Sequence, residues 1–231
     1  MGLKKLFILL LVISLTTPAF PLTDSRDSLL QALMATDIRS DKVIILNQLA
    51  NEFMKDDPAR AEDYASQALL ISESIQDLHG RSEAYYYLGS LALDKQEYDV
   101  SFDYLRKAEE GFTAESNETW LANVYLLLSE DYKRNLEYEN ALKLLYRAME
   151  TFKKEGKKKK LGETYNSIGG NYYDQGNYDK AFEYFSNSLE IFEDLEEVQL
   201  KGSLYNNLGE IYRLNKDYNR AIEYYKKSLQ I

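Results

Sequence analysis

The chain has no cysteine, and its 231 residues include only one histidine and three prolines. Without cysteine the protein cannot form a disulfide, use a thiolate nucleophile or hold zinc in a cysteine site. Three prolines are too few for a loop-rich fold. The one histidine, His79, has no second histidine with which to form a metal cluster. We therefore expect no metal and no other cofactor.

Acidic residues outnumber basic ones, with 38 Asp and Glu against 28 Lys and Arg, which gives a net charge of −10. A field of this sign repels phosphate backbones, so nucleic acid is not expected as a partner. Hydrophobic residues make up 45% of the chain and charged residues 29%. A chain of this length and composition can bury a sizeable core.

The first residues have the composition of a secretory leader. Two lysines in MGLKK precede the apolar run LFILLLVISL, and TPA follows it, ending at Ala19. This pattern predicts a signal peptide over residues 1–19, cleaved near Ala19, and export to the periplasm. The alternative is an uncleaved anchor, although a membrane span takes about 20 uninterrupted apolar residues. Residues 20–40 are expected to form a lead helix or linker.

The rest of the chain repeats itself every 40 residues. Small side chains recur at one position of each unit, namely Ala61, Ser101, Ala141, Ala181 and Ala221. A second such position holds Gly89, Ser129, Gly169 and Gly209. Glycine inside a helix costs about 1 kcal/mol relative to alanine, so its recurrence indicates that two helices approach closely. Because large apolar residues surround these positions at helical spacing, each unit is predicted to be a pair of antiparallel helices.

The last unit carries a motif of aromatic, Leu-Gly, aromatic, Ala, aromatic and small residues. These are Tyr205, Leu208, Gly209, Tyr212, Ala221, Tyr225 and Ser228. This order resembles the signature of the tetratricopeptide repeat. The resemblance implies an all-α fold, a right-handed solenoid of about five antiparallel helix pairs. It covers residues 41–231 as five repeats, at about 41–78, 79–118, 119–158, 159–198 and 199–231.

Two features set these units apart from the usual repeat of about 34 residues. They are longer, and the proline that often closes a unit is absent. Longer units after a short lead segment resemble the exported N-terminal region of bacterial sensor kinases and regulators. Because Ile231 corresponds to Ile191, in the middle of a unit, we expect this chain to be the N-terminal piece of a longer protein. Contact with a membrane is expected only through a segment beyond Ile231.

The resemblance also implies a concave binding face formed by the first helix of each repeat. The family's groove positions correspond here to Asn47, Asn51, Tyr86, Glu130, Lys133, Asn166, Tyr173, Asn206, Glu210 and Arg213. Asparagine suits a peptide backbone because its amide both donates and accepts hydrogen bonds. The predicted function is a non-catalytic scaffold that binds a peptide or protein segment. The alternative is the extracytoplasmic input module of a membrane-bound histidine kinase or regulator.

No group of residues indicates an enzyme. The acidic pairs in EDLEE, residues 193–197, are typical of a solvated helix face. His79 lies between two units and is interpreted as a solvated residue. The basic run KKEGKKKK, residues 153–160, is interpreted as a solvated turn, with a contact to an anionic partner as the alternative.

Overall fold

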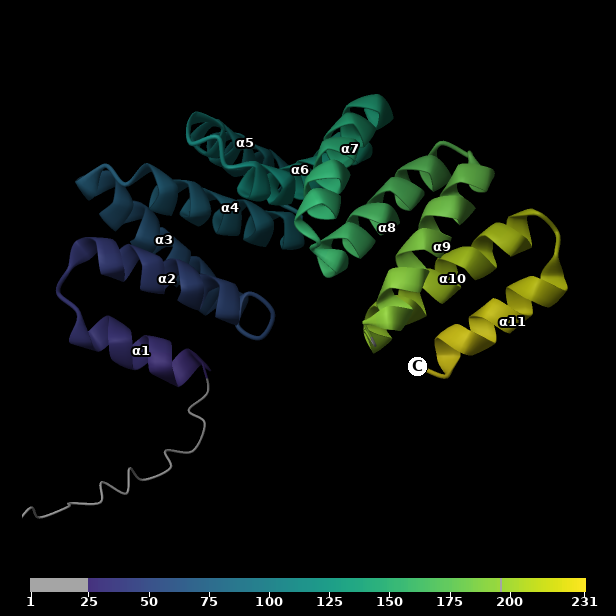
Figure 1. Ribbon diagram of the computed structural model, residues 1–231, viewed down its shortest axis with the longest axis horizontal. Helices are drawn as coiled ribbons and strands as arrows, with labels where there is room; N and C mark the ends of the chain where they lie inside the picture. Colours follow the sequence, from purple (N-terminus) through teal and green to yellow (C-terminus); the bar gives the residue numbers. More distant parts are fainter. Residues whose placement is uncertain (1–24, 196) are drawn as a thin grey trace, which may run out of the picture.

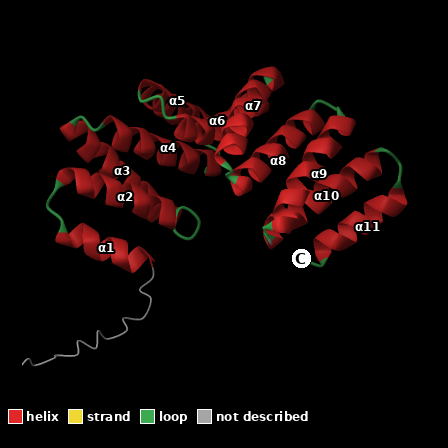
Figure 2. Cartoon of the chain, viewed as in Figure 1, coloured by secondary structure: helices red, strands yellow, loops and turns green. Residues whose placement is uncertain are grey.

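The computed structural model describes residues 25–195 and 197–231. The predicted signal peptide, residues 1–19, lies outside this part of the chain. The described residues form eleven helices and no strand (Figure 2). The helices are α1 (Ser25–Ala35), α2 (Arg39–Phe53), α3 (Pro58–Ile75), α4 (Leu78–Asp94), α5 (Tyr98–Ala114), α6 (Glu118–Arg134), α7 (Tyr138–Glu155), α8 (Lys158–Asp174), α9 (Tyr178–Asp194), α10 (Val198–Leu214) and α11 (Tyr218–Leu229).

The helices stack as five antiparallel pairs, which are α2–α3, α4–α5, α6–α7, α8–α9 and α10–α11. Each pair packs on the next, so that the chain follows an arch from α1 to α11 (Figure 1). Helix α1 precedes the first pair and packs on α2. The predicted all-α solenoid of five helix pairs is confirmed. None of α1–α11 has the length and hydropathy needed to cross a bilayer.

Each of the last four pairs turns through one residue with left-handed backbone. Within the last four pairs these residues are Gln96 (φ 63°), Leu136 (φ 62°), Gly176 (φ 74°) and Lys216 (φ 63°). The second helix then begins at Tyr98, Tyr138, Tyr178 or Tyr218. Its N-cap residue is the one before that tyrosine, and the side chains of Asn177 and Asp217 accept from backbone N–H groups of the first turn. A left-handed residue followed by a capping residue therefore ends one helix and starts the next.

The repeated small residues lie at the contact between the two helices of a pair. Ala61, Ser101, Ala141 and Ala181 are fully buried. A Cβ atom on Gly89 would lie 2.8 Å from Cγ of Leu105, and one on Gly209 would lie 2.9 Å from Cδ1 of Tyr225. The glycines therefore make room for a large side chain of the second helix.

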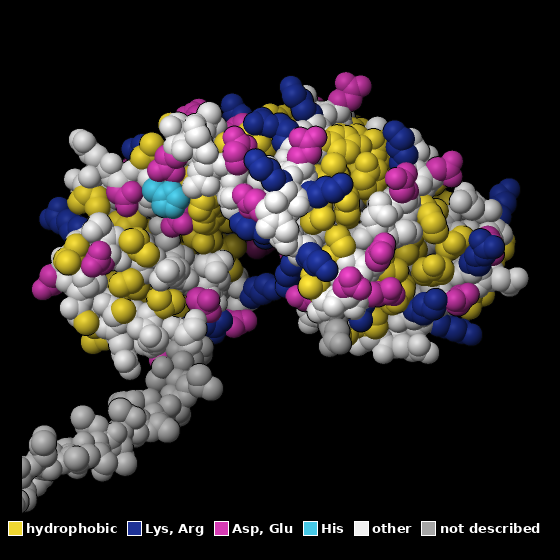
Figure 3. All heavy atoms as spheres, in the orientation of Figure 1, with side chains coloured by type: hydrophobic (Ala, Val, Ile, Leu, Met, Phe, Trp, Pro, Cys, Tyr) yellow, Lys and Arg dark blue, Asp and Glu magenta, His cyan; other side chains and the backbone are white. Residues whose placement is uncertain are grey.

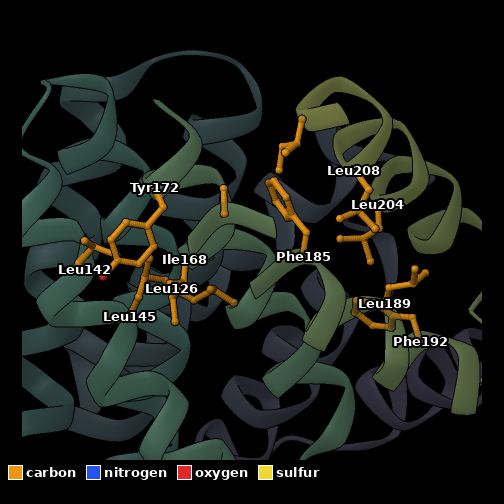
Figure 4. Packing of buried hydrophobic residues seen from close by; sticks show 12 residues of the cluster. Leu126, Leu142, Leu145, Ile168, Tyr172, Phe185, Leu189, Phe192, Leu204 and Leu208 are labelled. Carbon is orange, nitrogen blue, oxygen red and sulfur yellow. The ribbon is translucent and has the colours of Figure 1, made fainter. Parts of the chain in front are cut away.

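Large apolar side chains fill the space between pairs. Figure 4 shows Phe185 of α9 between two groups of residues, with Ile168 and Leu145 on one side and Leu204 and Leu208 on the other. Phe112, Phe152 and Phe192 are also fully buried, and they lie 40 residues apart near the ends of α5, α7 and α9. Since every repeat supplies the same apolar positions, the core continues from one pair to the next.

Candidate binding groove

One cavity brings together most of the predicted groove residues. It has a volume of about 350 Å³ and lies against α6, α8 and α10, the first helices of three successive pairs. Six of the ten predicted residues line it, namely Glu130, Lys133, Asn166, Tyr173, Asn206 and Glu210. Because the three helices are related by the 40-residue period, residues 40 apart in the sequence become neighbours across the cavity.

We call this cavity the inner cavity. Part of its wall is the backbone of α8. Gly170 lines it, and the nearest side-chain atom to a Cβ placed there would be Nζ of Lys133 at 4.0 Å. Phe185 of α9 also lines the cavity and belongs to the buried core. The inner cavity therefore has an apolar side, an exposed stretch of helix and a lysine ammonium group beside it.

Two ion pairs border the inner cavity. Lys133 Nζ lies 2.6 Å from Glu130 Oε2, and Arg213 Nε donates to both carboxylate oxygens of Glu210 at 3.0 and 2.9 Å. The hydroxyl of Tyr225 also donates to Glu210, at 2.6 Å. The hydrogen bonds from Arg213 and Tyr225 lower the pKa of Glu210 to about 2, so this carboxylate is ionised at neutral pH. Partly exposed ion pairs contribute little stability, and a ligand can exchange with one partner at small cost.

Asparagine amides supply the neutral polar groups. Asn166, Asn206 and Asn207 all line the inner cavity. The Oδ1 atom of Asn166 is buried and accepts no hydrogen bond. A buried acceptor without a donor costs about 1–3 kcal/mol, so a ligand N–H group placed there would be stabilised by a similar amount.

The comparison with protein families gives a match for the C-terminal repeats. The profile described as "Tetratricopeptide repeat" matches residues 120–194 and residues 160–231. Residues 120–231 match the tetratricopeptide repeat family. The inner cavity lies wholly within these residues. Among curated protein sequences no significant match is found.

Solved structures show the same fold. BtubC (BKLC) from P. vanneervenii is 19% identical with a TM-score of 0.72, covering 89% of this chain and 86% of that chain. A Rap protein complexed with Competence and Sporulation Factor is 18% identical with a TM-score of 0.73, covering 88% of this chain and 57% of that chain. PilF from Pseudomonas aeruginosa is 18% identical with a TM-score of 0.63, covering 83% of this chain and 77% of that chain. At these identities the likeness concerns the fold alone.

The remaining predicted groove residues lie elsewhere on the solenoid. Arg213 borders the inner cavity through its ion pair with Glu210. Asn51 lines a separate cavity beside α1, together with Ser25 and Leu29. Tyr86 packs its ring edge-on against Trp120, with centroids 5.2 Å apart, and burial raises the pKa of its hydroxyl to about 12. Tyr86 is thus mainly a packing residue.

The prediction for Asn47 is wrong. Its side chain is only 1% exposed, and Nδ2 donates to the carbonyl of Gly80 at 2.9 Å and to Glu83 at 3.2 Å. Asn47 therefore links α2 to α4 inside the protein, where no ligand in a groove could reach it.

His79 is not a freely solvated residue, although it does reach the surface (Figure 3). Its Nδ1 atom lies 2.8 Å from Oε2 of Glu115, so the contact joins the start of α4 to the C-cap of α5 within one helix pair. The same contact recurs one repeat on, where Thr119 donates to Glu155, and again where Lys159 Nζ lies 2.5 Å from Glu197. The sequence does contain a signal for this contact that the sequence analysis missed. Positions 79, 119 and 159 hold polar residues, and an acidic residue follows each of them 36 or 38 positions later.

The basic run, residues 153–160, includes the turn between α7 and α8. Lys157 pairs with Glu155 at 3.1 Å, and Lys160 pairs with Glu163 at 2.9 Å. These ion pairs agree with a turn between repeats. Within residues 25–195 and 197–231, no three His, Cys, Asp or Glu side chains are grouped so that they could hold a metal ion.

Proposed function

We propose that this protein is a non-catalytic interaction scaffold and that the inner cavity binds an extended peptide or protein segment. The observation that carries the proposal is the buried, unpaired Oδ1 atom of Asn166, within a cavity lined by three successive repeats. A backbone N–H of the ligand supplies the missing donor. The amide of Asn206, one repeat on, is exposed and offers a second donor and acceptor.

The charged groups of the inner cavity set the orientation of the ligand. Lys133 and Arg213 present cations, and Glu130 and Glu210 present anions, at a site that is open to solvent. Tyr173 adds a half-buried ring whose hydroxyl can also bond to the ligand. A ligand segment with one acidic and one basic side chain on the same edge forms ion pairs with both the cations and the anions of the inner cavity.

Selection of peptides from a random library tests this proposal. Peptides retained by the protein are measured by calorimetry against the parent and against Asn206→Ala combined with Arg213→Ala. We expect the double variant to bind at least tenfold more weakly and to melt at nearly the same temperature, because both side chains are exposed.

The matched control is the double variant Asn219→Ala with Lys226→Ala, which removes one asparagine and one basic side chain from α11. Both residues are exposed, and neither lines the inner cavity. The control is expected to bind like the parent. Equal weakening of the two double variants, or no weakening of either, would contradict a site in the inner cavity.

We also propose that the protein is exported, on the composition of residues 1–19. An extracytoplasmic input module of a signalling protein is the second candidate, and it would use the same inner cavity. Fusion of the leader to alkaline phosphatase tests export. Sequencing the reading frame downstream of the codon for Ile231 then separates a scaffold from an input module. An input module requires an apolar run of about 20 residues followed by an effector domain.

A further inference from the structure

A larger cavity lies at the edge of the solenoid where the helix pairs turn. Its volume is about 790 Å³, and it lies between the start of α5 and the end of α6. It shares no lining residue with the inner cavity. Its acidic lining residues are Glu97, Asp99, Asp103, Asp131 and Glu137, whereas Arg134 is its one basic lining residue. The aromatic rings of Tyr98, Phe102 and Tyr132 complete the wall.

Asp131 is the least exposed of these acids, at 3%. Its Oδ2 atom lies 3.5 Å from the hydroxyl of Ser101, and its Oδ1 atom is buried without any partner. The corresponding residues of the second and fifth repeats are Leu91 and Ile211, which are both buried. An apolar side chain therefore satisfies the packing at this position, whereas the carboxylate of Asp131 lies beside the cavity with one oxygen that accepts no hydrogen bond.

A smaller cavity repeats this arrangement one unit further along. It has a volume of about 420 Å³ and is lined by Glu137, Tyr138, Glu139 and Asn140, among others. These residues correspond, 40 positions on, to Glu97, Tyr98, Asp99 and Val100 of the larger cavity. We name the two cavities together the acidic edge.

The other repeats carry their own cation at this edge. Arg60 lies over the ring of Phe53 at 4.2 Å, Lys180 over Tyr172 at 4.7 Å, and Arg220 over Tyr212 at 5.5 Å. The corresponding residues of the second and third repeats are Val100 and Asn140, which line the two cavities. The second and third repeats therefore lack the cation at this position. The one basic residue of the larger cavity, Arg134, comes from the end of α6, and its guanidinium lies over the ring of Tyr98 at 3.1 Å.

We propose that the acidic edge binds a basic segment of a partner protein, with an arginine or lysine side chain entering the larger cavity beside Asp131. A cation there meets carboxylates and aromatic rings, which both attract it. A second basic side chain of the same segment reaches the smaller cavity. The site is separate from the inner cavity, so that the solenoid holds two partners, or two parts of one partner, at the same time.

The probe is a peptide, acetyl-Gly-Arg-Gly-Arg-Gly-amide, titrated into isotope-labelled protein and followed by NMR. Its counterpart has citrulline in place of arginine, which keeps the shape of the side chain and removes the charge. We expect saturable shifts in the backbone amides of residues 96–103 and 131–140 with the arginine peptide. The citrulline peptide should bind at least tenfold more weakly.

Two variants locate the site. Val100→Arg introduces the cation that other repeats carry and should weaken binding of the arginine peptide at least fivefold. Asp99→Asn with Asp103→Asn removes two exposed charges, keeps the fold and should weaken binding similarly. Asn187→Arg, on α9, adds the same charge as Val100→Arg away from both cavities and should have little effect.

Three results would overturn the proposal. They are equal binding of the arginine and citrulline peptides, shifts confined to the inner cavity around Asn166 and Asn206, and equal weakening by Val100→Arg and Asn187→Arg. The last result would show a general effect of net charge. Because the peptides selected for the inner cavity are measured separately, failure here leaves the scaffold proposal intact.

Discussion

The ring of Phe185 lies directly against the backbone of Gly169, so that a Cβ atom on this glycine would stand 2.7 Å from Cδ1 of the ring. The same relationship, 16 residues apart, joins Gly89 to Leu105 and Gly209 to Tyr225. It fixes how closely the two helices of each pair can pack. The adjacent Gly170 faces the inner cavity, where a side chain would meet no atom closer than Lys133 Nζ at 4.0 Å.

Substitution of these two neighbouring glycines by alanine should change the free energy of unfolding in opposite directions. Gly169→Ala forces Phe185, which is almost fully buried, to move and should lower the free energy of unfolding by about 1–3 kcal/mol. Gly170→Ala has open space and should raise it by up to about 1 kcal/mol through helix propensity. Urea denaturation followed by circular dichroism measures both. A stabilised Gly169→Ala variant would show that the contact with Phe185 is not limiting.

Leu136→Gly should stabilise the protein. Leu136 has a left-handed backbone with φ 62°, and its side chain is 71% exposed. Glycine removes a backbone penalty of about 1 kcal/mol or somewhat more and loses almost no packing. The melting temperature should therefore rise. Gly176→Ala, at the corresponding turn with φ 74°, is the converse substitution and should lower it.

Asp131 should make stability depend on pH. Burial raises the pKa of its carboxyl from an ordinary 3.8 to about 6. Because the folded state holds this proton more tightly than the unfolded state, stability is lost as the pH rises from about 4 to about 6. The loss should be on the order of 3 kcal/mol. Denaturation measured at several pH values should show this slope in the parent protein.

Asp131→Asn removes the titrating group and should flatten that slope. The next repeat already carries a buried asparagine, Asn171, at the corresponding position, so the substitution should be tolerated. Asp99→Asn, an exposed acid at the same edge, should leave the slope as it is. An unchanged slope in Asp131→Asn would mean that another group carries it.

His79 should add a separate effect at higher pH. Desolvation lowers its pKa, but the hydrogen bond with Glu115 and the charges of Glu83, Glu115 and Asp77 outweigh it, so the pKa lies above the ordinary value of 6.5. The stability that the charged imidazole contributes is present below pH 6.5 and is lost as the pH rises through the raised pKa. His79→Gln should remove this dependence above pH 6.5.

The expected effect of His79 is below about 1 kcal/mol, because the imidazole is partly exposed. Glu115→Gln should reproduce it, whereas Glu110→Gln, which changes an exposed acid on α5, should not. Trp120, the single tryptophan, lies 6.5 Å from His79 and stacks on Phe112 at 5.1 Å. Its fluorescence therefore reports on this part of the solenoid during unfolding.

Many of the residues that line the inner cavity could be predicted from the sequence. Once the period is known, residues 40 apart must lie at equivalent places on successive helices. Asn166 and Asn206, or Glu130 and Glu210, therefore face the same side of the stack, and they do line one cavity. The acidic edge was not predicted, since its acids look like an ordinary solvated helix face until the turns of two repeats are brought together.

The period alone does not decide how exposed each position is. Asn47 and Asn206 occupy equivalent positions, but Asn47 is buried against α4, whereas Asn206 is exposed on α10. The side chain of Asn47 is enclosed by the following repeat, which supplies Gly80 and Glu83 as its partners. Such differences depend on what packs on each repeat from either side.

The sequence by itself determined the helix pairs and their number, because small and large side chains recurring at one interval place the contact between two helices at the same positions of every unit. The tertiary structure decided which polar groups remain without partners. Asn166 and Asp131 each keep a buried oxygen unpaired, and whether a donor reaches such an atom depends on distances between repeats that no local pattern contains.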